Sequence, residues 1–188
     1  RTITLDYIID SFSNTKVNKM KPLIRTLLRM STYQLVYMEG VKDFAVCNEA
    51  VKLAMKRGFV SLKGFVNGVL RTISREKNNI SYPEGEDVVK NLSVKYSTPE
   101  WIVKKWIDAY SVEETIRILE AQFAARPLTV RCNTTKVSPA ELAERLIGQG
   151  IEVIRNSYFP EALEISGYDY LDKIPEFRKG MFSVQDMS

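Results

Sequence analysis

The stretch Leu62-Lys63-Gly64-Phe65-Val66-Asn67-Gly68-Val69-Leu70-Arg71-Thr72-Ile73 gives the clearest structural signal in this 188-residue chain. Its apolar residues recur at steps of three and four, which is the spacing of one face of an α-helix. Another face carries Lys63, Asn67, Arg71 and Arg75 at steps of four. The stretch therefore predicts an amphipathic helix with one apolar side and one basic side.

Three more helices are predicted ahead of this one by the same periodicity. They cover roughly residues 1–12, 22–39 and 43–57, with short connections between them. Asp43 is a candidate N-cap of the third helix, because a carboxylate there can accept from free backbone N–H groups. Four amphipathic helices with short loops predict an all-α bundle over residues 1–78. The expected buried side of the third helix consists of Phe44, Cys47, Val51, Ala54 and Met55.

The pattern of the sequence changes after the bundle. Residues 79–97 are predicted to be a linker, and alternation of apolar and polar residues over 128–133 predicts a strand. Residues 98–188 are therefore expected to form a small α+β module around an open sheet, so that the whole chain is α+β. Capped helices are predicted to begin near Thr98, Ser111 and Ser138. Further strands are predicted over 151–154, 162–165 and 181–184.

The charges are distributed unevenly between the two halves. The chain has a net charge of +4, but residues 1–80 hold 14 Lys and Arg against 6 Asp and Glu, while the remaining residues hold 13 against 17. A basic half joined to a mildly acidic half suggests two modules, of which the first faces a polyanion such as RNA. The alternative interpretation is an ordinary solvated charged surface.

Several kinds of chemistry are excluded by composition. The chain has no histidine, which rules out Ser-His-Asp triads, Cys-His pairs and histidine-ligated zinc within it, and no metal site is predicted. Its two cysteines, Cys47 and Cys132, fall on apolar faces and are expected to be buried. No run of about 18 apolar residues predicts a membrane span. A reducing cytoplasm is the simplest setting for such a chain.

Four phrases of the sequence, taken in order, point to one family. They are Leu27-Leu28-Arg29-Met30-Ser31-Thr32-Tyr33-Gln34-Leu35, Lys63-Gly64-Phe65-Val66-Asn67-Gly68-Val69-Leu70-Arg71, Tyr96-Ser97-Thr98-Pro99-Glu100-Trp101, and the segment Arg126 to Asn133 combined with Val184-Gln185-Asp186-Met187-Ser188. Together they resemble the bacterial 16S rRNA cytosine-5 methyltransferases called RsmB, Sun or Fmu. The first two phrases lie in a region that resembles the all-helical RNA-binding domain of the antitermination factor NusB.

The resemblance implies that this chain is part of a longer enzyme. It implies further helices before Arg1 and a catalytic domain after Ser188, which would be a partner of this region. It also implies an S-adenosylmethionine cofactor and two catalytic cysteines in motifs that this sequence lacks. No catalytic residue is therefore expected here, and the chain alone is expected to be inactive without a bound cofactor. By resemblance, Gln185, Asp186 and Ser188 would border the cofactor pocket of the longer protein.

The predicted contribution of this chain is RNA binding. Arg and Lys contact phosphates, and the planar fork of Arg also suits base edges. For Arg29, Asn67 and Arg71 the alternative is a structural role between helices. For Arg131 and Asn133 the alternative is that they are ordinary polar side chains in contact with water. Most Tyr and Phe residues fall on apolar stripes and are expected in the core rather than as exposed stacking pairs. The candidate RNA-binding residues are Arg29, Lys63, Arg71, Arg75, Arg126, Arg131 and Asn133.

The preferred functional hypothesis is the RNA-recognition region of a methyltransferase acting on 16S rRNA. One alternative is a non-enzymatic, NusB-like antitermination module. The length of the second half argues against it, since a stand-alone protein of that kind has no α+β extension. The other alternative is a related cytosine-5 methyltransferase that acts on tRNA or 23S rRNA.

Overall fold

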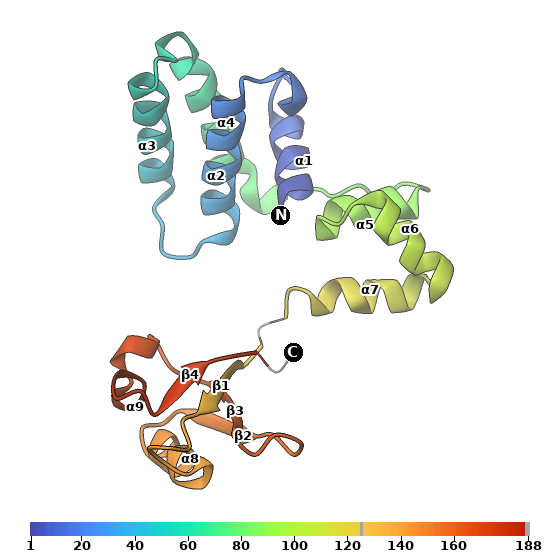
Figure 1. Ribbon diagram of the computed structural model, residues 1–188. Helices are drawn as coiled ribbons and strands as arrows, with labels where there is room; N and C mark the ends of the chain where they lie inside the picture. The colour runs from blue at the N-terminus through green and yellow to red at the C-terminus, as the bar shows by residue number, and fades with distance from the viewer. Residues whose placement is uncertain (125, 187–188) are drawn as a thin grey trace. The chain divides into compact units, whose positions relative to one another are not determined.

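Figure 1 shows a computed structural model of the protein, which describes residues 1–124 and 126–186. The chain folds as two compact units. Unit 1 spans Arg1–Phe123 and is helical, and unit 2 spans Ala124–Ser188 and contains a four-stranded sheet. The predicted α+β class, with a helical bundle before a small open sheet, is confirmed.

The first four helices of unit 1 form the predicted bundle. They are α1 (Thr2–Phe12), α2 (Pro22–Tyr37), α3 (Asp43–Lys56) and α4 (Lys63–Glu76), and α4 packs against each of the other three. Burial of their apolar stripes from water is the main force that holds them together. The 3-10 turns between and after them are Val17–Lys19, Val60–Leu62 and Lys77–Asn79. The largest fully buried side chains of this core are Ile8, Ile9, Ile24, Leu28, Val66, Leu70 and Ile73.

The third helix corrects two predictions. Asp43 does not cap α3; its carboxylate accepts from the Ser74 hydroxyl at 2.8 Å and from Lys77 Nζ at 2.8 Å, and so ties α3 to the end of α4. The Lys77 hydrogen bond is the largest cause that lowers the pKa of Asp43. Phe44 and Met55, expected in the core, are exposed, because the buried arc of α3 is instead centred on small residues. That arc consists of Val46, Cys47, Ala50 and Ala54.

Part of the segment predicted as a linker is helical. The helix α5 (Val88–Tyr96) lies within residues 79–97 and is followed by α6 (Glu100–Ala109) and α7 (Val112–Ala121). These three helices share a small core of their own, which consists of Leu92, Tyr96, Val103 and Leu119. The division into residues 1–78, 79–97 and 98–188 stays a prediction. The boundary between the two compact units falls after Phe123.

The α5 helix is anchored to the start of α1. Thr4 is fully buried, and its hydroxyl donates to the Val94 carbonyl at 2.6 Å. Ser97 has a left-handed backbone, with φ of 54°, and its hydroxyl oxygen accepts from the backbone N–H of Ile3 at 3.0 Å. Because the first N–H groups of a helix have no partner within it, Ser97 supplies a cap to α1 from a distant part of the sequence.

Unit 2 is built on an antiparallel sheet in the order β2-β3-β1-β4, with α8 between the first two strands in sequence. The predicted cap of α8 is confirmed, since the Ser138 hydroxyl accepts from the Glu141 backbone N–H at 3.2 Å. Val130, Leu163 and Ile165 face a core that α8 covers with Leu142 and Leu146. The elements are β1 (Leu128–Cys132), α8 (Pro139–Ile147), β2 (Glu152–Arg155), β3 (Ala162–Ser166), a 3-10 turn (Leu171–Lys173), α9 (Pro175–Arg178) and β4 (Phe182–Val184).

Candidate nucleic-acid interface

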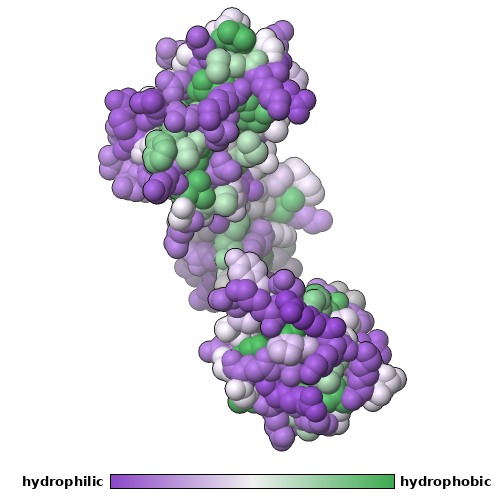
Figure 2. Space-filling view, turned by 90° about the vertical axis from the view of Figure 1, so that its left-hand side faces the viewer, coloured by the Kyte–Doolittle hydropathy of each residue, from purple (hydrophilic) through white to green (hydrophobic). Residues whose placement is uncertain are grey.

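A groove runs between α3 and α4 on the surface of unit 1. It consists of two neighbouring hollows of about 440 and 540 Å³, and Arg71 lines both of them. We call this surface the α3–α4 groove. Figure 2 looks onto the side of unit 1 where α3 lies, and shows a mostly hydrophilic surface with small apolar patches. The groove is lined by Asp43, Phe44, Cys47, Asn48, Val51, Lys52, Lys63, Gly64, Asn67, Gly68, Arg71, Thr72, Ser74 and Arg75.

Three of the predicted RNA-binding residues meet in this groove. Lys63, Arg71 and Arg75 are exposed along α4, while the opposite side of the helix is buried in the bundle. Arg71 Nε donates to Asn67 Oδ1 at 3.0 Å, which orients the guanidinium and supports the structural interpretation of Asn67. The terminal nitrogens of Arg71 have no protein partner among the described residues. They are therefore available for an anionic ligand.

Two glycines make the floor of the groove low. A Cβ added at Gly64 or Gly68 would meet no atom within 4 Å, so neighbouring packing does not require glycine at either position. Glycine inside a helix costs about 1 kcal/mol relative to alanine. Packing against neighbouring residues does not explain why glycine is present despite this cost. The exposed backbone at these positions allows a ligand to approach the helix closely. Neither glycine is among the predicted RNA-binding residues, although their four-residue spacing places both on one side of the helix.

An aromatic ring stands at one end of the groove. Phe44 is 65% exposed and lines the same hollow as Gly68, which has no side chain to pack against it. Phe44, expected on the buried side of α3, is one of several exceptions to the prediction that most Tyr and Phe residues lie in the core. The other aromatic side chains that are more than half exposed are Trp101, Tyr110, Tyr158, Phe159 and Tyr170.

Arg29 lies on α2, outside the α3–α4 groove, and its guanidinium is paired with Asp6. Its guanidinium donates to Asp6 through Nε and Nη2, both at 2.6 Å, and joins α2 to α1. The two side chains are only 29% and 30% exposed. A bidentate pair of this kind uses the fork that would otherwise bind phosphate. The geometry therefore favours the structural interpretation of Arg29.

Both cysteine thiols are buried, as predicted. Burial raises the pKa of the Cys47 thiol and of the Cys132 thiol. The Cys132 thiol lies 3.4 Å from the Val137 carbonyl, to which it can donate. A nucleophilic cysteine needs an exposed site that favours the thiolate, and neither residue has one.

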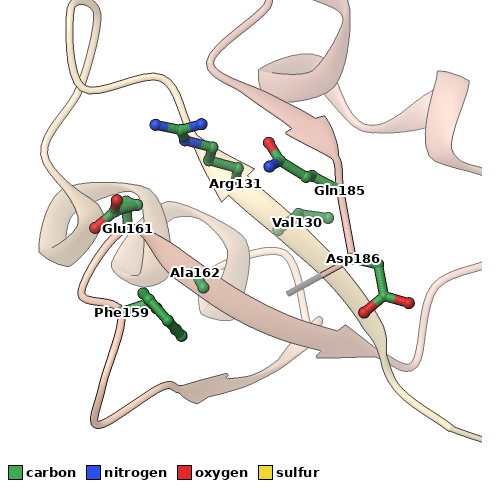
Figure 3. A pocket seen from close by; sticks show the side chains of 7 residues that line it. All are labelled: Val130, Arg131, Phe159, Glu161, Ala162, Gln185 and Asp186. Carbon is green, nitrogen blue, oxygen red and sulfur yellow. The ribbon is translucent and has the colours of Figure 1, made fainter. Parts of the chain in front are cut away.

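In unit 2, Arg131 lies on the face of the sheet opposite to the core. It pairs with Ala162 on β3 and with Ser183 on β4, and its side chain is exposed. Figure 3 shows Arg131 at the edge of a hollow of about 240 Å³. The hollow is lined by Val130, Arg131, Phe159, Glu161, Ala162, Gln185 and Asp186.

Asn133 does not share the free position of Arg131. Its amide nitrogen donates to the Gly180 carbonyl at 3.0 Å, and its oxygen accepts from the Thr135 hydroxyl at 2.6 Å and from the Thr135 backbone N–H at 3.2 Å. These bonds shape the turn after β1. They favour a structural role for Asn133 rather than RNA contact.

The remaining candidates lie beside these residues. Arg126 is exposed and lines a further hollow of about 590 Å³. Asp186 lines that hollow and the one in Figure 3, whereas Gln185 lines only the latter of these two. Ser188 lies outside the described residues. Among residues 1–124 and 126–186, no group of acidic or cysteine side chains is arranged to hold a metal ion, and no helix is long and apolar enough to cross a membrane.

Two family models match the chain. Residues 1–75 match the NusB family. Residues 98–168 match the ferredoxin-like domain of the RsmF/B-like methyltransferases. The second match includes α6 and α7 of unit 1 together with most of the sheet of unit 2.

Curated proteins resemble the whole length of the chain. A probable ribosomal RNA small subunit methyltransferase B of Bacillus subtilis (strain 168) is 38% identical over 99% of this chain, which corresponds to 41% of that protein. A relative of the same name from Synechocystis is 30% identical over 100% of the chain and 42% of that protein. The chain thus spans about two fifths of the length of these relatives. The crystal structure of PH0851 has a TM-score of 0.69, is 20% identical, and covers 97% of this chain and 41% of its own chain, a likeness of fold alone.

Proposed function

We propose that this chain is a member of the ribosomal RNA small subunit methyltransferase B family and forms the RNA-recognition region of an enzyme that methylates 16S rRNA at cytosine C5. The observation that carries this proposal is the order of its two domains. A NusB-family domain is followed in one chain by the ferredoxin-like domain of methyltransferases. A NusB-family domain that positions RNA for methylation elsewhere in the longer protein would account for the presence of both domains.

The α3–α4 groove is the part of unit 1 that we propose to hold the RNA backbone. Lys63, Arg71 and Arg75 place three positive charges along one side of it. Such contacts supply affinity and orientation with little sequence information. The low floor at Gly64 and Gly68 lets a phosphate approach the helix closely. Asn67 fixes the direction of the Arg71 guanidinium before RNA binds, which reduces the entropy lost on binding.

The methyl donor of the longer protein would be S-adenosylmethionine. Gln185 and Asp186 border a hollow of about 240 Å³, which is smaller than the ~300–1,000 Å³ typical of small-molecule sites. These residues do not by themselves form a site for that cofactor, and the two thiols of the chain are buried. The role we assign to the chain is therefore to bind and orient RNA, and we expect it to transfer no methyl group alone.

The direct test is filter binding of the 188-residue chain to hairpins from the 16S decoding region. Three phosphate contacts predict that the logarithm of the association constant falls with the logarithm of salt concentration with a slope of about −3. Absence of any binding at low ionic strength would count heavily against the proposal. Competition with tRNA and with 23S rRNA fragments tests the alternative substrates. The antitermination alternative does not account for residues 98–168, which match the ferredoxin-like domain of the RsmF/B-like methyltransferases.

Gly68→Ala is expected to separate stability from RNA binding. The added methyl group meets no protein atom, and alanine should stabilise α4 by up to about 1 kcal/mol. The same methyl group raises the floor of the groove, so hairpin binding should weaken, with a salt slope shallower by about 0.9 if one phosphate contact is lost. Thermal unfolding and filter binding measure the two effects. Thr26→Ala, on the exposed side of α2, is the control that should leave RNA affinity unchanged; a Gly68→Ala protein with unchanged affinity would place the RNA elsewhere.

A further inference from the structure

We propose that the hollow on the face of the sheet opposite to the core of unit 2 is a binding pocket for one unpaired nucleobase that carries an exocyclic amine. This inference rests on the proposed RNA-recognition function and names a second, base-selective contact. The pocket is formed by side chains from three segments (Figure 3). Arg131 comes from β1, Phe159 and Glu161 come from the β2–β3 connection, and Gln185 follows β4.

Its size and one wall suit a flat ring. The hollow measures about 240 Å³, enough for a single base but below the usual size of sites for larger ligands. Phe159 is 52% exposed and lines it. Unpaired bases in RNA are commonly held by stacking on aromatic side chains. The small Ala162 in the floor leaves the space open.

The loop that carries Phe159 is held in place. Asn156 Oδ1 accepts from the backbone N–H groups of Tyr158 and Phe159, at 2.8 and 2.9 Å. The Phe159 carbonyl accepts from the Ala162 N–H at 2.9 Å, which closes the connection onto β3. The ring is therefore presented by a hydrogen-bonded turn, so little conformational freedom is lost when a base stacks on it.

The polar groups of the pocket provide for base selection. The Glu161 carboxylate, the Arg131 guanidinium and the Gln185 amide have no hydrogen-bond or ion-pair partner among the described residues. A carboxylate only accepts hydrogen bonds, so it suits an exocyclic amine such as cytosine N4 and opposes the carbonyl that uracil presents there. Arg131, at the edge of the hollow, can contact the adjoining phosphate.

The charges of the pocket indicate a base and not a phosphate. The Glu161 carboxylate lines the pocket beside the Arg131 guanidinium, and its negative charge opposes entry of a phosphate group. The backbone of the RNA would then follow Arg131, which also lines a neighbouring hollow of about 470 Å³. The described residues that line the pocket include no thiol or hydroxyl nucleophile, so the role that we assign to them is to position a base.

The test measures binding of labelled single-stranded RNA pentamers of cytidine and of uridine by fluorescence anisotropy. The 188-residue chain is expected to bind the cytidine pentamer at least threefold more tightly. Phe159→Ala should weaken cytidine binding about tenfold, in the range of base–aromatic stacking. Glu161→Gln should bring the two affinities close together, since an amide can both donate and accept. Arg131→Ala should make the salt slope shallower by about 0.7, the value for one contact to a single strand.

Tyr158→Ala is the matched control. Tyr158 is the neighbouring aromatic residue, it is 86% exposed, and it does not line the pocket. Its removal should leave both affinities unchanged. Equal binding of the two pentamers by the unaltered chain overturns the pocket, and so does an equal loss of affinity in Phe159→Ala and Tyr158→Ala. If decoding-region hairpins still bind with the expected salt slope, the proposed function survives that result; if no RNA binds at low salt, both proposals fail.

Discussion

Reversing the charges of Arg71 and Arg75 is expected to reduce the affinity for 16S hairpins by about tenfold or more near 0.1 M salt. Both side chains are exposed in the α3–α4 groove, and neither is joined to an acidic residue among the described residues. Arg71→Glu with Arg75→Glu removes two phosphate contacts and adds two repulsive charges. The loss should be similar for different hairpin sequences, because phosphate contacts carry little sequence information.

The salt dependence is the more diagnostic measurement for this double variant. Loss of two contacts should make the slope of the logarithm of affinity against the logarithm of salt shallower by about 2. Lys104→Glu with Lys105→Glu makes the same change in net charge on the exposed surface of α6 and serves as the control. An equal loss from both double variants would show that net charge, and not the groove, governs RNA binding. Circular dichroism should show both proteins folded.

Leu70→Ala, one residue from Arg71, is expected to act on stability instead. Leu70 is fully buried in the core shared by α1 to α4. Removing its side chain leaves a cavity that the surrounding helices fill only in part, which typically costs about 2–5 kcal/mol. We expect urea denaturation of unit 1 to show this loss in the free energy of unfolding, with a lower midpoint concentration of urea. The RNA affinity of the remaining folded protein should change little, because the groove lies on the other side of α4.

Val60→Ala is the comparison for this variant. Val60 is a large apolar residue outside the bundle core and is 54% exposed. Its truncation should change the free energy of unfolding by less than about 0.5 kcal/mol. A loss below about 1 kcal/mol for Leu70→Ala would contradict the placement of α4 at the centre of the bundle. Together, the Arg71→Glu/Arg75→Glu variant and the Leu70→Ala variant test whether one face of α4 binds RNA and the opposite face stabilises the bundle.

Periodicity predicted the helices and strands because it reflects burial directly. The α4 stripe, with its 3-4 spacing, is buried as expected at Val66, Val69, Leu70 and Ile73. Each predicted strand segment overlaps one strand of the sheet. In such segments each apolar side chain has only one way to leave water, so the local pattern determines the element.

The errors occur where the partner of a residue lies far away in sequence. Phe44 has helical spacing with core residues, but Gly68 offers it no side chain to pack against. Asp43 has the sequence position of an N-cap, but in the structure its carboxylate accepts hydrogen bonds from Ser74 and Lys77. The helix α5 was missed because its short apolar stripe is meaningful only against α6, α7 and the start of α1.

The sequence by itself determined the fold class, the basic side of α4, the burial of both cysteines and the family that the chain resembles. Only the tertiary structure decided which polar groups are free. Arg29, Asn133, Arg71 and Arg131 were all predicted to bind RNA. In the structure, the Arg29 side chain is bound to Asp6 and the Asn133 side chain to the Gly180 carbonyl. The physical reason is that a hydrogen bond needs its partner within about 3 Å, and that distance is set by how the helices and strands pack.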